Sequence, residues 1–295
     1  MNDLTTDAPI RVPTRSFSVR LSAFFVILSS LLVFGELAID HAGRGVSAAH
    51  QPWVKLTLGL LLSGVMIAVY RVLVIWLENR KPQELSGESF GRFLSSGILI
   101  GLSLFASVYL IFWISDALTI DGSGDTSHLI SAMALSITAG FAEEIVLRGV
   151  LFRLVEEKLG TVIALLISAG LFGLLHLANR GATLASAASV ALEGGVLLGL
   201  AFAATRKLWF PIGLHIGWNF AEGGIFGAAV SGRESHGIVH ASLSGSSLMT
   251  GGTFGPEQSL VAVGVSLLGS LIFLIIAMRR GELKPFSLKV NRTVN

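Results

Sequence analysis

The chain contains 295 residues, of which 52% are hydrophobic and only 14% are charged, and its mean hydropathy is +0.74. Soluble domains carry roughly 25% charged residues, so the composition excludes an ordinary water-soluble globule and a disordered chain. A sequence without cysteine excludes a disulfide scaffold, a thiolate metal site and a cysteine nucleophile. The net charge of +2 does not point to nucleic acid, so the basic pI of 9.2 needs a positional explanation.

Eight apolar stretches approach or exceed the length of about 20 residues that a membrane-spanning helix needs. They cover residues 21–39, 53–77, 93–119, 128–152, 160–178, 184–204, 209–230 and 258–278. We therefore expect an all-α, polytopic membrane protein with about eight transmembrane helices. The first stretch is as long as a span and shows no obvious small-residue cleavage site, so we interpret it as a retained helix rather than a signal peptide.

The lysines and arginines predict the orientation of these helices. Alternate connections carry fifteen basic residues on one side and three on the other, and positively charged loops remain cytoplasmic. Both termini are therefore expected in the cytoplasm. We divide the chain into a flexible cytoplasmic tail at 1–16, N-terminal transmembrane helices at 17–127, a central group of helices at 128–230, an extracytoplasmic loop at 231–257, and a last helix with a basic cytoplasmic tail at 258–295.

The fourth stretch contains ionisable residues at membrane depth, where each costs about 2.5–3.5 kcal/mol and is by default a functional candidate. Glu144 and Arg148 are four residues apart and share a helix face, whereas Glu143 points about 100° away. A buried ion pair that only stabilises helix packing would explain Glu144 and Arg148. It leaves Glu143 unexplained, so we expect a functional carboxylate here.

His176 follows on the fifth stretch. A single histidine on an apolar helix is usually an interhelical hydrogen-bonding residue. The position of His176 in the chain nevertheless favours a functional role. If the chain reverses between Lys158 and Gly160, Glu143 and His176 both lie about 25 Å from that turn, at 1.5 Å per residue. The carboxylate and the imidazole could then meet on neighbouring antiparallel helices.

His215 and Asn219 lie one turn apart on the seventh stretch and present two polar groups on one face. Packing between helices would be the simpler explanation for such a pair. His215 follows the basic Arg206–Lys207 connection closely, which predicts a shallower position than that of His176. Either this helix begins inside the protein, with Trp209 and the two residues after it partly sunk, or the site opens toward the cytoplasm.

Three further acids lie in or near the spans. Glu193 stands beside glycines that allow close helix contact, and we favour a structural hydrogen bond for it. Glu222 is either a supporting residue behind Asn219 or a residue near the outer end of its helix. Glu36 is close enough to a helix terminus to contact water.

The three polar elements resemble one known family. Glu143-Glu144-x-x-x-Arg148, Phe172-x-x-x-His176 and His215-x-x-x-Asn219, in this order on successive helices, are similar to the motifs of the CPBP intramembrane proteases. That family includes CAAX prenyl endopeptidases of the Rce1 type and bacterial Abi-domain proteins. The resemblance covers roughly residues 128–225, within the 128–230 region that would form the CPBP/Abi-like catalytic core.

The resemblance implies an intramembrane endopeptidase, a hydrolase whose active site lies inside the helix bundle. Its substrate would be a membrane-associated protein or peptide, and it would work in the bilayer of a bacterial cytoplasmic membrane without nucleic acid and without a cofactor. In this family's pattern Glu143 and His176 activate water, and His215 and Asn219 stabilise the oxyanion. Glu144 and Arg148 would orient or tune Glu143.

Three other functions remain as alternatives. A zinc-dependent metalloprotease could use the same glutamates and histidines, although no His-Glu-x-x-His motif is present. A non-catalytic immunity or scaffold protein could retain the motifs without activity. A proton-coupled transporter would also bury Glu, Arg and His, but we would expect broken helices in repeated halves.

Overall fold

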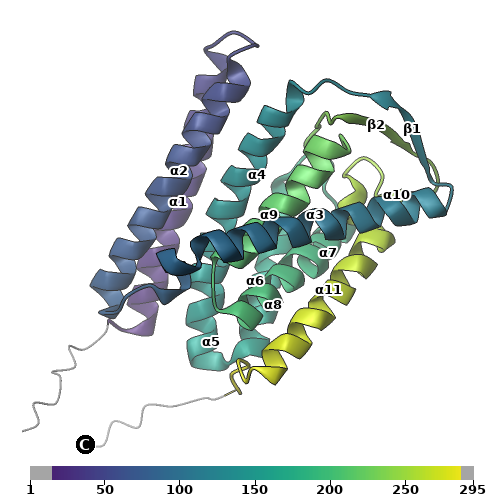
Figure 1. Ribbon diagram of the computed structural model, residues 1–295. Helices are drawn as coiled ribbons and strands as arrows, with labels where there is room; N and C mark the ends of the chain where they lie inside the picture. The colour runs from purple at the N-terminus through teal and green to yellow at the C-terminus, as the bar shows by residue number, and fades with distance from the viewer. Residues whose placement is uncertain (1–14, 287–295) are drawn as a thin grey trace, which may run out of the picture.

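The computed structural model describes residues 15–286, and its chain is mainly helical (Figure 1). The predicted tail at 1–16 and the last part of the basic tail lie mostly outside the described residues. The longer helices are α1 (Phe17–Arg44), α2 (Gln51–Glu78), α3 (Phe90–Ile114), α4 (His128–Glu144), α5 (Arg153–Leu159), α6 (Thr161–Leu175), α7 (Leu184–Val190), α8 (Leu197–Thr205), α9 (Trp209–Asn219) and α11 (Leu260–Arg279). Short helices lie at Gln83–Leu85, Gly87–Ser89, His176–Ala178, Ser247–Thr250 (α10) and Pro256–Gln258.

Three π-helical segments join helices that the sequence predicts as single stretches. Ile145–Phe152 connects α4 to α5, Ala191–Val196 connects α7 to α8, and Phe220–Ile225 continues α9. A π-helical turn inserts extra backbone into a helix and is often found at functional sites. The prediction of an all-α polytopic protein is confirmed.

Seven helices within the described residues are long and apolar enough to span a membrane. All eight predicted stretches are helical, but α9 with its π-helical extension covers only 209–225, which is shorter than a typical span. Its length is explained by its surroundings, because every residue of α9 is buried in the protein. The structure thus has seven helices of spanning length among the described residues, and the remaining predicted stretch forms the shorter, buried helix α9.

The start of α9 lies inside the protein and not at a membrane surface. The Leu208 N–H donates to the Glu84 carbonyl at 2.9 Å, and the Trp209 indole donates to the Ser86 carbonyl at 2.9 Å. Trp209 and Phe210 are each only 5% exposed. Of the two arrangements that the sequence allows, the structure therefore favours the one in which this helix begins inside the protein.

Glycines allow α3 to pack directly against α9. A Cβ atom at Gly97 would lie 2.3 Å from the Phe210 carbonyl oxygen, and one at Gly101 would lie 2.2 Å from that of Leu214. From the other side, a Cβ at Gly217 would lie 2.2 Å from the Ile98 carbonyl oxygen. Small residues spaced four apart permit this close backbone contact between membrane helices. The contact sets the position of the helix that carries His215 and Asn219.

The segments outside the spans contain more structure than the sequence indicates. The third helix ends at Ile114 instead of continuing to residue 119, and β1 (Leu118–Ser123) follows it. β1 pairs antiparallel with β2 (Val239–Leu243), which belongs to the segment predicted as a plain loop at 231–257. Hydropathy alone did not indicate this pairing, because the two strands are short, largely exposed and far apart in the chain.

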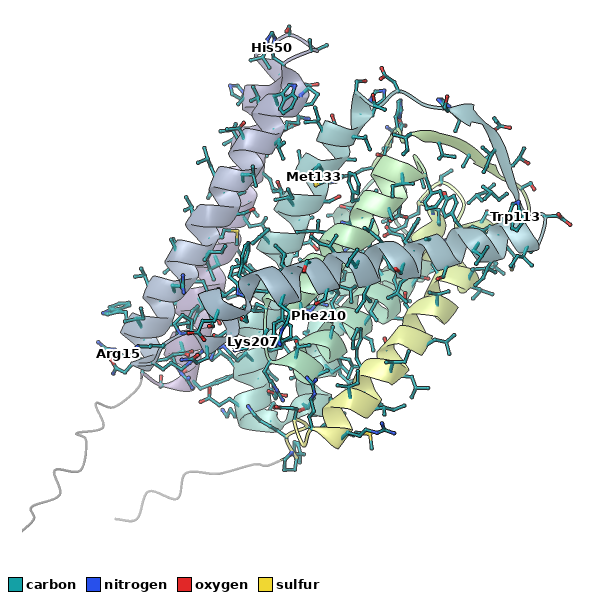
Figure 2. All side chains as sticks on the ribbon, viewed as in Figure 1. Arg15, His50, Trp113, Met133, Lys207 and Phe210 are labelled. Carbon is teal, nitrogen blue, oxygen red and sulfur yellow. The ribbon has the colours of Figure 1, made fainter. Side chains whose placement is uncertain are left out.

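The outer surface of the bundle is apolar along the long helices. Large side chains such as Phe34, Trp76 and Leu268 are each more than 60% exposed, and side chains of this kind project outward around the bundle (Figure 2). A surface of this type would be costly in water and is suited to contact with lipid chains.

Charged groups gather around Glu78 and Glu84, at the end of the bundle where α1 begins and α11 ends (Figure 1). Glu78 accepts hydrogen bonds from Arg80 at 2.7 Å and from Arg153 at 2.8 Å, and Arg80 also binds Glu84. The Tyr70 hydroxyl donates to Glu84 and at 3.0 Å to the Gly149 carbonyl. These contacts connect the end of α2, the segment before α3 and the long helix 128–159.

Candidate active site

A cavity of about 350 Å³ brings the predicted site residues together. Its walls come from α1, α4, the end of α6, the π-helical segment of 184–205, α9 and the segment 231–257. Glu143, His176, His215 and Asn219 all line this cavity. The structure thus places Glu143 and His176, which the sequence predicts to approach each other, on the walls of one cavity.

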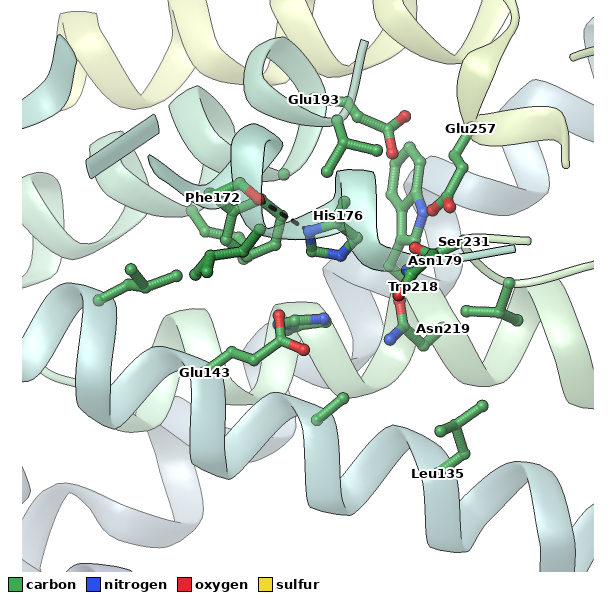
Figure 3. Close-up of a pocket in the computed structure, with 18 of the residues that line it drawn as sticks. Leu135, Glu143, Phe172, His176, Asn179, Glu193, Trp218, Asn219, Ser231 and Glu257 are labelled. Carbon is green, nitrogen blue, oxygen red and sulfur yellow. Dashed lines mark hydrogen bonds between the residues drawn. The ribbon is translucent and has the colours of Figure 1, made fainter. Parts of the chain in front are cut away.

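Glu143 and His176 project into the same space from α4 and from the end of α6 (Figure 3). Glu143 is half-buried, and its Oε2 atom is enclosed and has no hydrogen-bond partner within the described residues. A buried carboxylate oxygen without a partner is unfavourable in a finished core. It is suited to a site that binds water or substrate.

The orientation of His176 follows from a single hydrogen bond. Its Nδ1 atom lies 2.8 Å from the Phe172 carbonyl oxygen, one helical turn earlier. Because a carbonyl can only accept, Nδ1 must carry the proton and the neutral ring keeps a lone pair on Nε2. His176 is half-buried and lines the cavity, so that lone pair is available to accept a proton.

Glu144 and Arg148 form the ion pair that their spacing predicts. Arg148 Nη1 donates to Glu144 Oε1 at 2.8 Å, and both side chains are fully buried. Glu144 Oε1 also lies 3.1 Å from His215 Nδ1. Among the described residues no hydrogen bond connects Glu144 or Arg148 to Glu143, so the pair supports His215 directly.

Arg148 also holds neighbouring helices together. Its Nη2 atom donates to the Gly194 and Gly195 carbonyls at 2.9 and 3.0 Å, and its guanidinium lies 4.8 Å from the centre of the Phe172 ring. Arginine is suited to this position because its planar group can bind several acceptors and stack on an aromatic face at once. The residue therefore links the helix of Glu143 to the helices on both sides of the cavity.

His215 and Asn219 line the cavity from α9 and are 7% and 9% exposed. They lie one turn apart, as their spacing predicts. Since the Glu144 carboxylate accepts from Nδ1 of His215, the other ring nitrogen is left for the cavity. This pair thus offers an imidazole nitrogen and an amide on one side of the space that Glu143 and His176 enter.

Two additional acids line the cavity, and the sequence did not assign either to it. Glu193 and Glu257 are each 4% exposed, and their carboxyl groups lie close to each other (Figure 3). Glu257 arrives on the segment after Gly255, whose φ of +124° suits glycine. Burial raises the pKa of Glu257 above its ordinary value, which favours its neutral form.

Glu222 and Glu36 lie in more buried positions than the water-exposed helix ends that the sequence allows for them. Glu222 is fully buried, and neither carboxylate oxygen has a partner within the described residues, so it is not at a wet helix end. Glu36 is half-buried and lines the cavity from α1. In the sequence, the only indication of these buried positions is an acidic residue within an apolar stretch.

A resident metal ion needs at least three convergent ligands. Among residues 15–286, no group of three or more His, Asp or Glu side chains is arranged to hold one. The side chains of the described residues therefore offer no three-ligand site for zinc.

One comparison with known proteins finds a match over the segment that carries most of the site residues. Residues 125–221 match the family model described as type II CAAX prenyl endopeptidase Rce1-like. No curated protein matches the chain, and no solved structure matches it. The matched residues include Glu143, His176 and His215, together with the helices that carry them. Over this third of the chain the protein is therefore similar to the Rce1-like proteins of the CPBP family, and the similarity indicates a membrane protease.

Proposed function

We propose that the protein is an intramembrane endopeptidase that hydrolyses a peptide bond of a membrane-associated protein or peptide, of the CAAX type or related to it. The observation that carries this proposal is the convergence of Glu143, His176, His215 and Asn219 on one cavity. They supply both a means of activating water and a means of stabilising negative charge, which are the two requirements of amide hydrolysis.

Glu143 and His176 would act on the water. The unpartnered Glu143 oxygen and the Nε2 lone pair of His176 are the two free proton acceptors on this side of the cavity. One accepts a proton as the water oxygen attacks the carbonyl carbon, and the protonated group then donates to the leaving amine. The hydrogen bond to the Phe172 carbonyl keeps the imidazole in the tautomer that this role needs.

His215 and Asn219 would bind the oxyanion. Asn219 can donate from its amide, but His215 can donate into the cavity only if both ring nitrogens carry protons, since Nδ1 already donates to Glu144. The buried Glu144 carboxylate, 3.1 Å away, stabilises that imidazolium. Glu144 and Arg148 are therefore positioning residues for His215 in this mechanism.

The first test is Glu143→Gln. The substitution removes a proton acceptor and keeps a side chain of similar size, so cleavage should fall by about 10²–10⁴-fold while the fold is retained. Cleavage of a membrane-protein reporter by the purified variant, at matched protein amount, provides the measurement. Thermal unfolding close to that of the wild type would show that structure is unaffected. Cleavage by Glu143→Gln at the wild-type rate would refute the role of Glu143. A transporter or a scaffold protein, by contrast, would not cleave the reporter even with Glu143 present.

The second test concerns zinc, the nearest chemical alternative. The same side chains are legitimate zinc ligands, and a catalytic zinc needs three of them plus water. We expect activity to persist after exhaustive chelation, and elemental analysis of active protein to find metal far below one equivalent. Stoichiometric zinc, with activity that disappears on removal and returns on addition, would establish a metalloprotease instead.

A further inference from the structure

A second cavity adjoins the candidate active site. Its volume is about 780 Å³, and it lies between α1, the start of α2, α4 and residues 233–236. We call it the access cleft. Val33, Glu36, Leu135 and Arg233 line both the access cleft and the active-site cavity. The two spaces therefore meet at these four residues, which form the neck between them.

The access cleft is located at the end of the bundle opposite to the chain termini. It is lined by Asp40 near the end of α1, by Lys55 near the start of α2 and by His128 at the start of α4. Figure 1 shows the connection between α1 and α2 and the start of α4 at one end, with the start of α1 and the end of α11 at the other. An object that enters through the access cleft therefore approaches Glu143 from the side that is far from both termini.

The end of the bundle opposite to the access cleft is closed by packed side chains. Leu85 and Leu208 are fully buried, and the Leu208 N–H binds the Glu84 carbonyl. Tyr70 bonds to the Gly149 carbonyl, two turns of helix beyond Glu143 toward the termini. The charged contacts around Glu78 and Glu84 cover this packing. This end thus has a filled core and an ion-pair layer between the cavity and the membrane surface.

The lining of the access cleft indicates what it can hold. Three acids, two bases and two histidines line it, together with serine and threonine side chains. Charged groups at membrane depth normally face water, because lipid cannot solvate them. Apolar side chains such as Leu37, Ile39 and Leu135 line the cleft as well, so it is suited to a hydrated peptide chain that carries both polar and apolar side chains. Its mixed charges also suit a chain that carries both signs.

The distribution of basic residues indicates which end of the bundle faces the cytoplasm. Arg20, Arg80 and Arg153 form ion pairs at the end near the termini. They belong to the fifteen basic residues that mark the cytoplasmic side, against three on the other. The access cleft accordingly opens on the extracytoplasmic side.

We propose that the protease receives its substrate through the access cleft, as an extended, hydrated peptide segment that lies on the extracytoplasmic side of the membrane. This inference rests on the proposed function, and it narrows the substrate class. The cleaved segment belongs to an exported peptide or to an extracytoplasmic part of a membrane protein. A prenylated cytoplasmic carboxyl terminus would approach from the closed end.

The sequence without cysteine allows a direct test by single-cysteine labelling. Val33 and Phe34 are neighbours on α1 and are 54% and 70% exposed, but only Val33 lines the access cleft. Intact cells that carry Val33→Cys or Phe34→Cys would be treated with a small charged methanethiosulfonate that does not cross membranes. We expect Val33→Cys to react about tenfold faster or more, because the reactive thiolate forms only in contact with water.

Two further variants establish the side of the membrane. Glu234→Cys, at a residue whose side chain is 84% exposed beside the cleft, should react in intact cells. Glu88→Cys, exposed at the end near the termini, should react only after permeabilisation. Equal rates for Val33→Cys and Phe34→Cys would overturn the water-filled route. Reaction of Glu88→Cys but not Glu234→Cys in intact cells would overturn the extracytoplasmic location.

These labelling experiments do not depend on hydrolysis, so their failure is distinguishable from failure of the proposed function. A final experiment with purified protein tests whether the substrate of the cleavage reaction uses the access cleft. Attachment of a bulky maleimide at Val33→Cys should abolish cleavage of the reporter, whereas the same modification at Phe34→Cys should leave it at the unmodified level. Full modification at Val33→Cys with unchanged cleavage would show that substrate does not use this route.

Discussion

At the residue scale, two adjacent glutamates have different surroundings because successive helix residues point about 100° apart. Glu143 faces the cavity and keeps an unpartnered oxygen, whereas Glu144 faces the interior and binds Arg148 and His215. Removal of one partner from a buried ion pair is strongly destabilising, because the other charge stays buried without compensation. The two positions should therefore respond to the same chemical change in different ways.

Glu144→Gln should reduce the free energy of unfolding by about 3–5 kcal/mol, because Arg148 would remain buried without its carboxylate. The double variant Glu144→Gln/Arg148→Gln should lose less than the sum of the two single variants, since neither charge remains. Unfolding in detergent with a chemical denaturant gives the required double-mutant cycle.

Glu234→Gln is the matched control for this cycle, because Glu234 forms an exposed pair with Arg180 at 4.0 Å. Exposed pairs of this kind contribute little, so its effect should stay below about 1 kcal/mol. Additive losses for Glu144 and Arg148 would mean that the two residues do not depend on each other.

At the element scale, the short helix α9 is held by its neighbours and not by its own length. It carries His215 and Asn219, it is buried along its whole length, and glycines bring it into backbone contact with α3. A helix of this length gains most of its stability from tertiary packing. The spacing of α3 and α9 is thus the structural variable that positions the oxyanion-binding pair.

Gly217→Ala should disturb that spacing, because the new Cβ would lie 2.2 Å from the Ile98 carbonyl oxygen. Overpacking of this kind costs about 1–3 kcal/mol, and here it should also lower cleavage by displacing His215 and Asn219. Thermal unfolding and the reporter assay measure the two effects.

Gly264→Ala on α11 is the control, since a Cβ atom there would have no neighbour within 4 Å. It should be neutral or stabilising by up to about 1 kcal/mol, because alanine favours a helix over glycine. If Gly217→Ala behaved like Gly264→Ala in both assays, close contact between α3 and α9 would not position the site.

At the scale of the whole molecule, the two ends of the bundle differ in construction. One end is sealed by ion pairs around Glu78 and Glu84, and the other contains the access cleft. Burial alone would raise the pKa of Glu84, but the hydrogen bonds and charge of Arg80 and the charge of Arg153 outweigh it. The pKa of Glu84 in the folded protein is therefore lower than its ordinary value.

This shift predicts how acid affects the sealed end. A group whose pKa is lowered by folding contributes stability above its unfolded pKa, and that contribution is lost as the pH falls through the folded pKa. The wild type should thus lose stability as the pH falls below about 4.3, the ordinary pKa of a glutamate side chain, and Glu84→Gln should flatten part of that loss. Thermal unfolding across this range measures it. An unchanged acid slope in Glu84→Gln would remove Glu84 from the contacts that stabilise this end.

The sequence by itself determined the features that depend on local spacing. Apolar runs of about 20 residues located the helices, because lipid requires every backbone group to bond within its own segment. The interval of four residues predicted the Glu144–Arg148 pair and the shared face of His215 and Asn219. The family motifs indicated a membrane protease and its six candidate residues, whose catalytic roles stay predictions.

Only the tertiary structure decided which separate elements meet. His215 contacts Glu144 across 71 residues of sequence, and Glu257 reaches the cavity on a segment that appeared to be a plain loop. The burial of α9, the β1–β2 pair and the access cleft likewise depend on how distant segments pack. Hydropathy and spacing describe each helix against lipid or water, whereas these contacts depend on the free energy of helices packed against one another.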